Sequence, residues 1–365
     1  MNIEILGVDP RNKGAALMLE AVKANITPTF SNARFCVPLS FNIDERLKYG
    51  LWSVIPRDTS TKRFISKIVD LFVPQKLLSK VGIIKDKNID VIIDSSGFAY
   101  GDFWGVEKLD KRLGRNVSNW KKQNKKIILL PQAWGPFDKE GFKPVLDKVV
   151  SHADIMFARD KQSLGFVQGA VGNLHENLFQ APDFTCLLEA NASGSLLEYN
   201  NSTFVIPNEK VIKSFGQESR KLYLDYLCLA CKKLVAQGHS VVLLNHEGKR
   251  DAALAEEILK LLGTDSSSVK VLSLDNPIAT KFVLANARAI VSSRFHGLVS
   301  ALSSGVPSLA CGWSHKYEEL LADYNCSKYV VDFTKEEDAA IKLDQFLEDC
   351  NSEEFRNVLL DKAKY

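Results

Sequence analysis

Several signatures of common enzyme classes are missing from this sequence of 365 residues. It has neither Gly-x-Gly-x-x-Gly nor the P-loop pattern, so neither NAD nor ATP is indicated as a ligand. It also has no Gly-x-Ser-x-Gly elbow, which disfavours a serine hydrolase. The Asp-x-Asp pair, with which many sugar-nucleotide transferases bind a cation, is absent as well.

Composition excludes further classes of protein and of partner. The 47 Lys and Arg residues nearly balance 44 Asp and Glu residues, so nothing favours nucleic acid as the main partner. No apolar run reaches the roughly 18 residues that a membrane-spanning helix needs. Seven unpaired cysteines at irregular positions fit a reducing cytosol, and we expect a cytoplasmic protein. The histidines lack metal-like spacing, so no metal site is expected.

The stretch 63–81 is basic and amphipathic. Two interpretations of it stay open. It could lie on a membrane surface as a peripheral contact, or it could be a helix that packs on a core or covers a cleft.

Short apolar runs alternate with longer helical patterns along the chain. The strand candidates are residues 3–8, 34–38, 91–94, 126–130, 155–158, 178–181, 203–206, 240–244, 269–272, 289–292, 308–311 and 328–331. The helical patterns include residues 17–25, 142–151, 222–237, 251–262 and 297–304. This βαβα alternation predicts an α/β fold with parallel sheets covered on both faces.

Two Rossmann-like lobes facing a cleft are expected, because a single core stops growing at roughly 250–300 residues. A stretch rich in Ser, Asn and Gly, residues 189–202, separates the two series of strands. The predicted domains are therefore residues 1–189 and 190–340. A helical tail, residues 341–365, follows, and its return to the first lobe is one option.

The most informative motif is Ser292-Ser293-Arg294-Phe295-His296-Gly297, which joins a predicted strand to a predicted helix. In open parallel sheets, ligands bind beyond the carboxyl ends of the strands, where helix N-termini favour anions. Arg294 offers a planar fork for a carboxylate or phosphate, and His296 can exchange a proton near neutral pH. The next strand leads to Lys316, which we expect close to both. The alternative is a salt-bridged surface turn.

Five strand candidates of the first lobe also end in polar residues. The segments that follow them include Asn12-Lys13-Gly14, Ser95-Ser96-Gly97-Phe98-Ala99-Tyr100-Gly101-Asp102, Pro131-Gln132-Ala133-Trp134-Gly135-Pro136, Arg159-Asp160 and Pro182-Asp183. Singly, each has a structural alternative, such as an ion pair at a helix start for Arg159 or a turn cap for Asp183. Together they support a cleft lined from this lobe.

These segments, in this order, resemble the signature of the polysaccharide pyruvyl transferases. The segments that carry the resemblance are Asn12-Lys13-Gly14-Ala15, Ser96-Gly97-Phe98-Ala99-Tyr100-Gly101-Asp102, Leu130-Pro131-Gln132-Ala133-Trp134-Gly135-Pro136, Ala158-Arg159-Asp160-Lys161-Gln162-Ser163, Ala181-Pro182-Asp183-Phe184, Ser293-Arg294-Phe295-His296-Gly297-Leu298-Val299-Ser300 and Lys316. The chain departs from many members at Ala15-Ala16, where they carry an acidic residue.

The resemblance implies a GT-B-like fold and a reaction. The donor would be phosphoenolpyruvate, and the acceptor a hydroxyl pair on a glycan or its lipid-linked precursor. The product would be a pyruvate ketal, with release of phosphate and without a metal or redox cofactor. We predict His296, Arg294 and Lys316 as catalytic residues. The predicted substrate-binding residues are Arg159, Asn12, Gly14, Ser96, Gly97, Tyr100, Gln132, Trp134, Asp183, Ser293 and Gly297.

Within this hypothesis, Arg159, Arg294 and Lys316 would hold the two anionic groups of the donor, and His296 would act as general acid and base. The rings of Tyr100, Trp104 and Trp134 could stack on a sugar, although Trp104 fits a core position equally well. Two alternatives stay open: a GT-B glycosyltransferase that uses a nucleotide sugar, and a non-catalytic binder of anions or carbohydrate.

Overall fold

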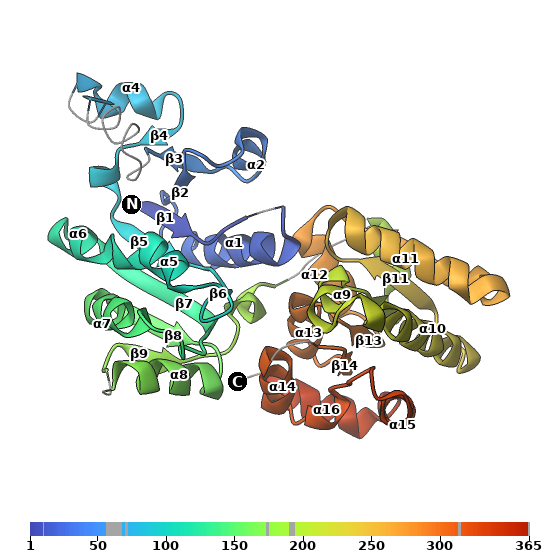
Figure 1. Ribbon diagram of the computed structural model, residues 1–365. Coiled ribbons are helices and arrows are strands. Elements are labelled where there is room, and N and C mark those ends of the chain that lie inside the picture. Colours follow the sequence, from blue (N-terminus) through green and yellow to red (C-terminus); the bar gives the residue numbers. More distant parts are fainter. Residues whose placement is uncertain are drawn as a thin grey trace. The chain divides into compact units, whose positions relative to one another are not determined.

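The computed structural model describes residues 1–9, 11–55, 68–69, 72–172, 175–189, 194–312 and 315–363. The chain divides into two compact units (Figure 1). The first comprises residues 1–10 and 18–188, and the second comprises residues 11–17 and 189–365. The division near residue 189 follows the expected linker, but residues 11–17 group with the second unit, although they precede most of the first in sequence.

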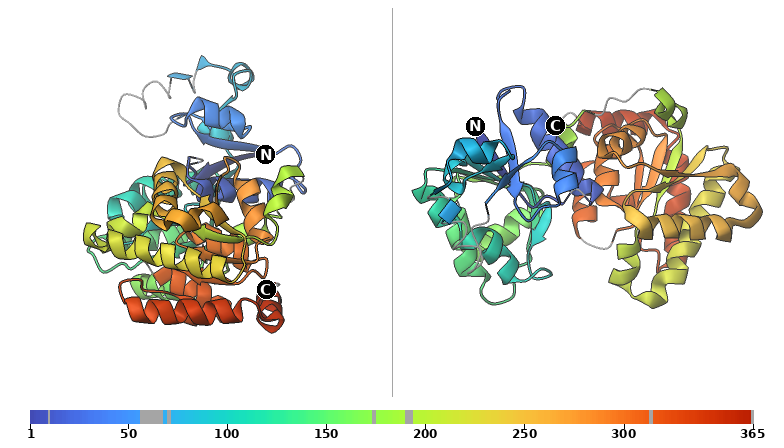
Figure 2. Two further views of the ribbon diagram at one scale, coloured as in Figure 1. Left: turned by 90° about the vertical axis from the view of Figure 1, so that its right-hand side faces the viewer. Right: turned by 90° about the horizontal axis from the view of Figure 1, so that it is seen from above.

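The first unit is built on a parallel sheet of nine strands among its described residues. Eight of them follow the order β4-β3-β2-β1-β5-β7-β8-β9, and β6 pairs with the carboxyl half of β7. The strands are β1 Asn2–Leu6, β2 Arg34–Pro38, β3 Trp52–Val54, β4 Ile83–Ile84, β5 Val91–Asp94, β6 Phe98–Tyr100, β7 Lys126–Trp134, β8 Ile155–Ala158 and β9 Leu178–Gln180. Helices flank the strands (Figure 2).

The helices of this part of the chain are α1 Lys13–Ile26, α2 Ile43–Lys48, α4 Gln75–Ser79, α5 Val106–Leu109, α6 Val117–Lys122, α7 Phe142–His152 and α8 Lys161–Val171. Side-chain caps mark the start of α2 and α8. For example, the Asp160 side chain accepts a hydrogen bond from the backbone N–H of Ser163 at the start of α8, at 2.7 Å. Gly172 ends the same helix in the left-handed conformation, which glycine adopts at little cost.

The second unit contains a parallel sheet of order β12-β11-β10-β13-β14. Its strands are β10 Thr203–Ile206, β11 Val241–Asn245, β12 Val269–Ser273, β13 Ala289–Ser292 and β14 Ser308–Ala310. Its helices are α9 Glu209–Phe215, α10 Arg220–Ala236, α11 Gly248–Leu262, α12 Pro277–Ala285, α13 Phe295–Leu302, α14 His315–Asp323, α15 Glu336–Asp349 and α16 Glu353–Ala363. Every residue of β10, β11 and β13 is buried, as expected for strands covered on both faces.

The predicted α/β fold with parallel strands is confirmed, with one strand candidate wrong. Residues 328–331 form no strand: a 3₁₀ turn, Ser327–Tyr329, stands there, and only a single bridge joins Val330 to Ala310. The tail packs within the second unit. In α16, Leu360 lies against Gly305, and an Arg356 Nη2–H donates to the carbonyl of Arg288. Its return to the first lobe stays a prediction.

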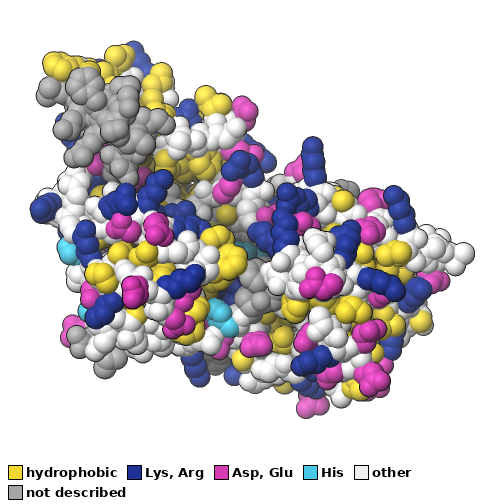
Figure 3. All heavy atoms as spheres, viewed as in Figure 1, with side chains coloured by type: hydrophobic (Ala, Val, Ile, Leu, Met, Phe, Trp, Pro, Cys, Tyr) yellow, Lys and Arg dark blue, Asp and Glu magenta, His cyan; other side chains and the backbone are white. Residues whose placement is uncertain are grey.

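The surface mixes charges of both signs, as the composition predicts. In the view of Figure 3, Lys and Arg side chains are interspersed with Asp and Glu. Among the helices that the structure describes, none combines the length and the apolar character needed to cross a membrane.

We predict that protonation of His239 destabilises the second unit at acidic pH. The residue is 5% exposed, its Nδ1 lies 2.7 Å from the Thr203 hydroxyl, and burial lowers its pKa from 6.5 to about 4. Since the unfolded chain binds this proton more readily, the free energy of unfolding should fall as the pH drops from about 6.5 to about 4. In His239→Asn, the difference between urea unfolding free energies at pH 7.5 and 5.0 should be smaller. An unchanged difference would contradict this role.

Candidate functional site

The sheet of the second unit has a topological switch point between β10 and β13. The chain leaves β10 for β11 on one side and later returns to β13 on the other. In open parallel sheets, ligands bind beyond the carboxyl ends of the strands at such a point. Two polar turns lie there. One contains Asn208 after β10, and the other contains Ser293 and Arg294 after β13.

Buried hydrogen bonds fix the turn after β13. The Ser293 carbonyl accepts from Asn208 Nδ2 at 2.8 Å and from the Tyr317 hydroxyl at 3.0 Å. The Tyr223 hydroxyl donates to Ser293 Oγ at 2.7 Å. Ser293 itself is completely buried. This predicted substrate-binding residue therefore orients the turn.

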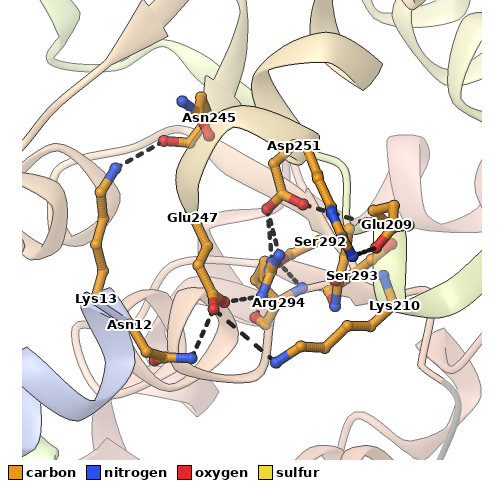
Figure 4. Close-up of polar contacts among 12 residues, drawn as sticks. Asn12, Lys13, Glu209, Lys210, Asn245, Glu247, Asp251, Ser292, Ser293 and Arg294 are labelled. Atoms are coloured by element: carbon orange, nitrogen blue, oxygen red, sulfur yellow. Dashed lines mark hydrogen bonds and ion pairs between the residues drawn. The ribbon is translucent and has the colours of Figure 1, made fainter. Parts of the chain in front are cut away.

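Arg294 enters the site as part of an ion network (Figure 4). Its Nε–H donates to Asp251 Oδ2 at 2.8 Å, Nη2 lies 2.5 Å from the same oxygen, and Nη1 pairs with Glu247. Asp251 is 0% exposed, and burial raises the pKa of its carboxyl group. The guanidinium is thus oriented by two carboxylates, which more than offset its positive charge. A substrate anion that approached Arg294 would encounter a guanidinium already paired with Asp251 and Glu247.

The start of α1 and the residue before it belong to the same site. Asn12 Nδ2 donates to Glu247 Oε1 at 2.7 Å, and Lys13 Nζ donates to the carbonyl of Asn245 at 3.0 Å (Figure 4). Lys13 is half-buried, and burial lowers its pKa although nearby carboxylates, Asp275 foremost, oppose the shift. These contacts place residues 11–17 in the second unit.

Gly14 and His296 are in direct contact. A β-carbon added at Gly14 would lie 2.3 Å from His296 Nδ1, so no other residue fits there without moving the imidazole. His296 occupies the first turn of α13, with Arg294 as the N-cap residue of that helix. The structure therefore unites four predicted site residues: Asn12, Gly14, Arg294 and His296.

The third predicted catalytic residue, Lys316, lies on α14 after the neighbouring strand β14. Its Nζ is 5.2 Å from the ring centroid of Phe295, the residue between Arg294 and His296. The expected pairing of β13 and β14 is confirmed. Gly297, in contrast, is buried, and an added β-carbon would lie 3.1 Å from Ser292 Oγ. Its role is to let α13 approach the sheet.

Three site residues were missed from the sequence: Glu247, Asp251 and His246. All lie just beyond the carboxyl end of β11. His246 is buried, and in the part of the chain that the structure describes its Nδ1 has no hydrogen-bond partner. Burial, then the charges of Arg294, Lys13 and His296, lower its pKa far below the usual value. In the sequence, the only feature that marked these three residues as candidates was their position after a strand.

In the first unit, the structure brings Arg159 and Asp183 together. Arg159 Nη1 donates to Asp183 Oδ2 at 3.0 Å, and both side chains are almost completely buried. Gln132, on the neighbouring strand β7, is 0% exposed, and no described residue bonds either of its amide atoms. Arg159 and Arg294 belong to different units, so their expected approach stays a prediction.

Ser96 lies in a second polar network of this unit. Its hydroxyl donates to Asp94 and accepts from Arg112 Nη1 at 2.7 Å, while the Tyr100 hydroxyl donates to Asp94 Oδ2 at 2.5 Å. Burial raises the pKa of Tyr100 well above its usual value. The neighbouring Gly97 has a φ of +68°, which favours glycine.

The predicted stacking of Tyr100 and Trp134 on a sugar ring is wrong. Both rings are 0% exposed, and they stack on each other with centroids 5.1 Å apart. The Trp134 indole N–H donates to the carbonyl of Phe157 at 3.0 Å. They therefore form part of the core.

Two further expectations concern metals and membranes. Among the described residues, no three His, Cys, Asp or Glu side chains are grouped to hold a metal ion. Residues 63–67 and 70–71 of the stretch 63–81 lie outside the described residues. Of the described part, Phe72, Leu77 and Val81 are exposed, and peripheral membrane contact stays a prediction.

Comparisons with known proteins agree on a family and a fold. A family model described as polysaccharide pyruvyl transferase matches residues 12–315. No curated protein sequence matches the chain. UDP-GlcNAc 2-epimerase from Methanocaldococcus jannaschii is similar in structure, with a TM-score of 0.59 and 12% identity over 97% of this chain and 94% of that chain.

Two further solved structures are a glycosyltransferase from Rickettsia africae and HepE from Anabaena in complex with UDP-glucose. The first has a TM-score of 0.57 and 10% identity over 100% of this chain and 92% of that chain. The second has a TM-score of 0.56 and 12% identity over 100% and 94%. At these identities the likeness shows the fold alone, which is GT-B-like.

The contact between Gly14 and His296 predicts an unusual response to alanine. Alanine favours helices over glycine by up to about 1 kcal/mol. In α8, the exposed Gly165 has open space around it, so Gly165→Ala should stabilise the protein. Gly14→Ala should give no such gain and should shift the NMR signals of the His296 ring. Urea unfolding tests both variants, and equal stabilisation by the two would refute the contact.

Proposed function

This chain belongs to the polysaccharide pyruvyl transferase family, and on that premise we propose that it transfers the enolpyruvyl group of phosphoenolpyruvate to two hydroxyls of a sugar. The product is a pyruvate ketal on a glycan or its precursor, and phosphate is released. The observation that carries the proposal is the meeting of His296 with Gly14 beside Arg294, at the start of a helix.

The reaction adds one proton to a carbon atom of the donor and releases one phosphate group from it. A proton is added to the methylene carbon of the donor, which makes its central carbon electrophilic. One sugar hydroxyl attacks that carbon, and the carbon–oxygen bond to phosphate breaks. The second hydroxyl then closes the ketal. Of the two hydroxyl protons released, one balances the new methyl group and the other balances the departing phosphate.

We assign the proton transfers to His296, because imidazole can give and take a proton near neutral pH. Its half-buried ring is held against Gly14 at the N-terminal end of α13, where backbone N–H groups favour an anion. Lys13 and Lys316 supply the ammonium groups that would pair with the carboxylate and phosphate of the donor. Arg294, held by Asp251, would present its remaining N–H groups to the same ligand.

A nucleotide-sugar transferase is the second candidate. It is favoured by the solved structures of similar fold, one of which holds UDP-glucose. Such an enzyme would use the same helix N-terminus and cations for a diphosphate. A non-catalytic binder is less well supported, because anion binding alone does not need a group that exchanges protons near neutral pH, as His296 can.

Ligand-dependent melting separates the two candidates. A ligand that binds only the folded protein raises the melting temperature, with a gain of about 2.7 kcal/mol at a concentration of 100 times its Kd. We expect stabilisation by phosphoenolpyruvate and none by UDP at equal concentration. The opposite pattern would favour the nucleotide-sugar transferase.

Substitution of His296 tests the proposed chemistry. His296→Asn keeps a polar side chain but removes proton exchange near neutral pH, so kcat should fall by about 10²–10⁴-fold. Phosphate release from phosphoenolpyruvate, with a panel of glycosides as acceptors and mass detection of the ketal, measures this loss. His152→Asn, a change on α7 in the other unit, is the matched control and should keep full activity. Wild-type rates in His296→Asn would exclude the assignment.

A further inference from the structure

Three aromatic side chains form a partly exposed cluster in the first unit. Phe103 is 68% exposed and Trp104 is 38% exposed. Their rings meet edge to face with centroids 4.8 Å apart, and Phe98 lies within 6.5 Å of Phe103 and 6.0 Å of Trp104. Large aromatic rings are normally buried, so such a cluster on a surface marks a candidate binding site.

A rigid turn holds these rings at the surface. The backbone N–H groups of Trp104 and Gly105 both donate to the carbonyl of Gly101, at 2.9 and 3.1 Å. The Asp102 carboxylate accepts from the backbone N–H groups of Asp138 and Lys139. Gly101 fits tightly against a second loop, because an added β-carbon there would lie 2.4 Å from the carbonyl oxygen of Gly135. The rings are thus preorganised and need little ordering on binding.

The cluster lies on the edge of the sheet where ligands bind. Phe98 begins β6, which pairs with Ala133 and Trp134 at the carboxyl end of β7. The turn follows β6 directly. Ser96 and Gly97 stand between β5 and β6, so the same segment continues from the carboxyl end of β5. In parallel sheets this edge carries the ligand-binding loops.

A cation completes the surface. Lys108 Nζ, on α5, lies 3.5 Å from the ring centroid of Trp104. An aromatic ring packs against the C–H face of a sugar, and an ammonium group donates to its hydroxyl oxygens. The ammonium group lies over a face of the Trp104 ring, so the more exposed Phe103 ring offers the main stacking face, and the group as a whole suits a neutral pyranose.

We propose that Phe103 and Trp104, with Lys108, form the platform on which a pyranose ring of the acceptor glycan stacks. The class of ligand rests on the proposed function, since a polysaccharide-modifying enzyme must bind a sugar. A membrane surface fits less well, because the carboxylates of Asp102 and Glu107 offset the ammonium groups of Lys108 and Lys139, which leaves no net positive charge at the turn to attract anionic lipid.

Binding of simple pyranosides tests the platform without any need for catalysis. The probe is a panel of methyl hexopyranosides at high concentration, and saturation-transfer-difference NMR measures their contact with the full-length protein. We expect transfer to the ring protons of at least one pyranoside. In Phe103→Ala and Trp104→Ala, its Kd should rise by about tenfold, as for the loss of one aromatic contact.

Phe30→Ala is the matched control. Phe30 is 50% exposed and lies between α1 and β2, at the amino-terminal edge of the same sheet. This variant should bind the pyranoside as the wild type does. Equal binding by wild type, Phe103→Ala and Trp104→Ala would overturn the proposal, as would the lack of transfer to every pyranoside of the panel.

Kinetics then separate the platform from the proposed function. For pyruvyl transfer, Phe103→Ala should raise the KM for the acceptor by about tenfold, and it should leave unchanged both the KM for phosphoenolpyruvate and kcat at saturating acceptor. An unchanged acceptor KM would overturn the platform while the proposed function stands. Pyranoside binding that depends on Phe103, in a protein that never consumes phosphoenolpyruvate, would support the platform while the proposed function fails.

Discussion

The ion network of Arg294, Asp251 and Glu247 is the constraint on which the rest of the second unit's site depends. A carboxylate that is completely buried, as Asp251 is, costs several kcal/mol in lost hydration unless a partner compensates it. Arg294 supplies that partner through two of its nitrogens, and through a third it holds Glu247. Removal of any member would leave charge buried or unpaired.

The same network explains why residues 11–17 belong to the second unit. Glu247 accepts from Asn12, and the carbonyl of Asn245 accepts from Lys13, so the carboxyl end of β11 and the residues after it bind the start of α1. Gly14 then has to lie against His296, since Asn12 and Lys13 are already anchored. Contacts made by the neighbours of the imidazole therefore fix its position. The turn at Ser293, which precedes His296, is itself held by buried hydrogen bonds.

The sequence predicted the parts of the molecule that depend on local pattern. The bounds of β2, β5, β8, β10 and β13 agree with the structure, because each is a short apolar run with polar residues at its ends. The strands β3, β4 and β6 have only two or three residues and were missed, whereas β9 and β14, with three residues each, were predicted within slightly longer candidate runs. The run 328–331 is apolar enough for a strand. Its first residues belong to a 3₁₀ turn instead, and only one bridge attaches the run to the sheet.

The site was predictable to the extent that its residues lie in turns after strands. Arg294, His296, Asn12 and Gly14 were found in this way. Their partners Glu247 and Asp251 lie 47 and 43 positions from Arg294, and no local pattern connects residues that far apart. Tyr100 and Trp134 show the opposite difficulty. An aromatic residue beside a glycine or proline gives the same pattern whether its ring is buried or exposed, and only packing decides.

The buried arginines of both units share a further feature that bears on the proposed chemistry. Arg294 pairs with Asp251, and Arg159 pairs with Asp183. Because each guanidinium is already paired with a carboxylate, its orientation is fixed before any ligand arrives. Lys13 differs from these arginines, because the protonation state of its amine can change. Burial lowers the pKa of Lys13, and a bound phosphate or carboxylate would oppose that shift and favour its ammonium form.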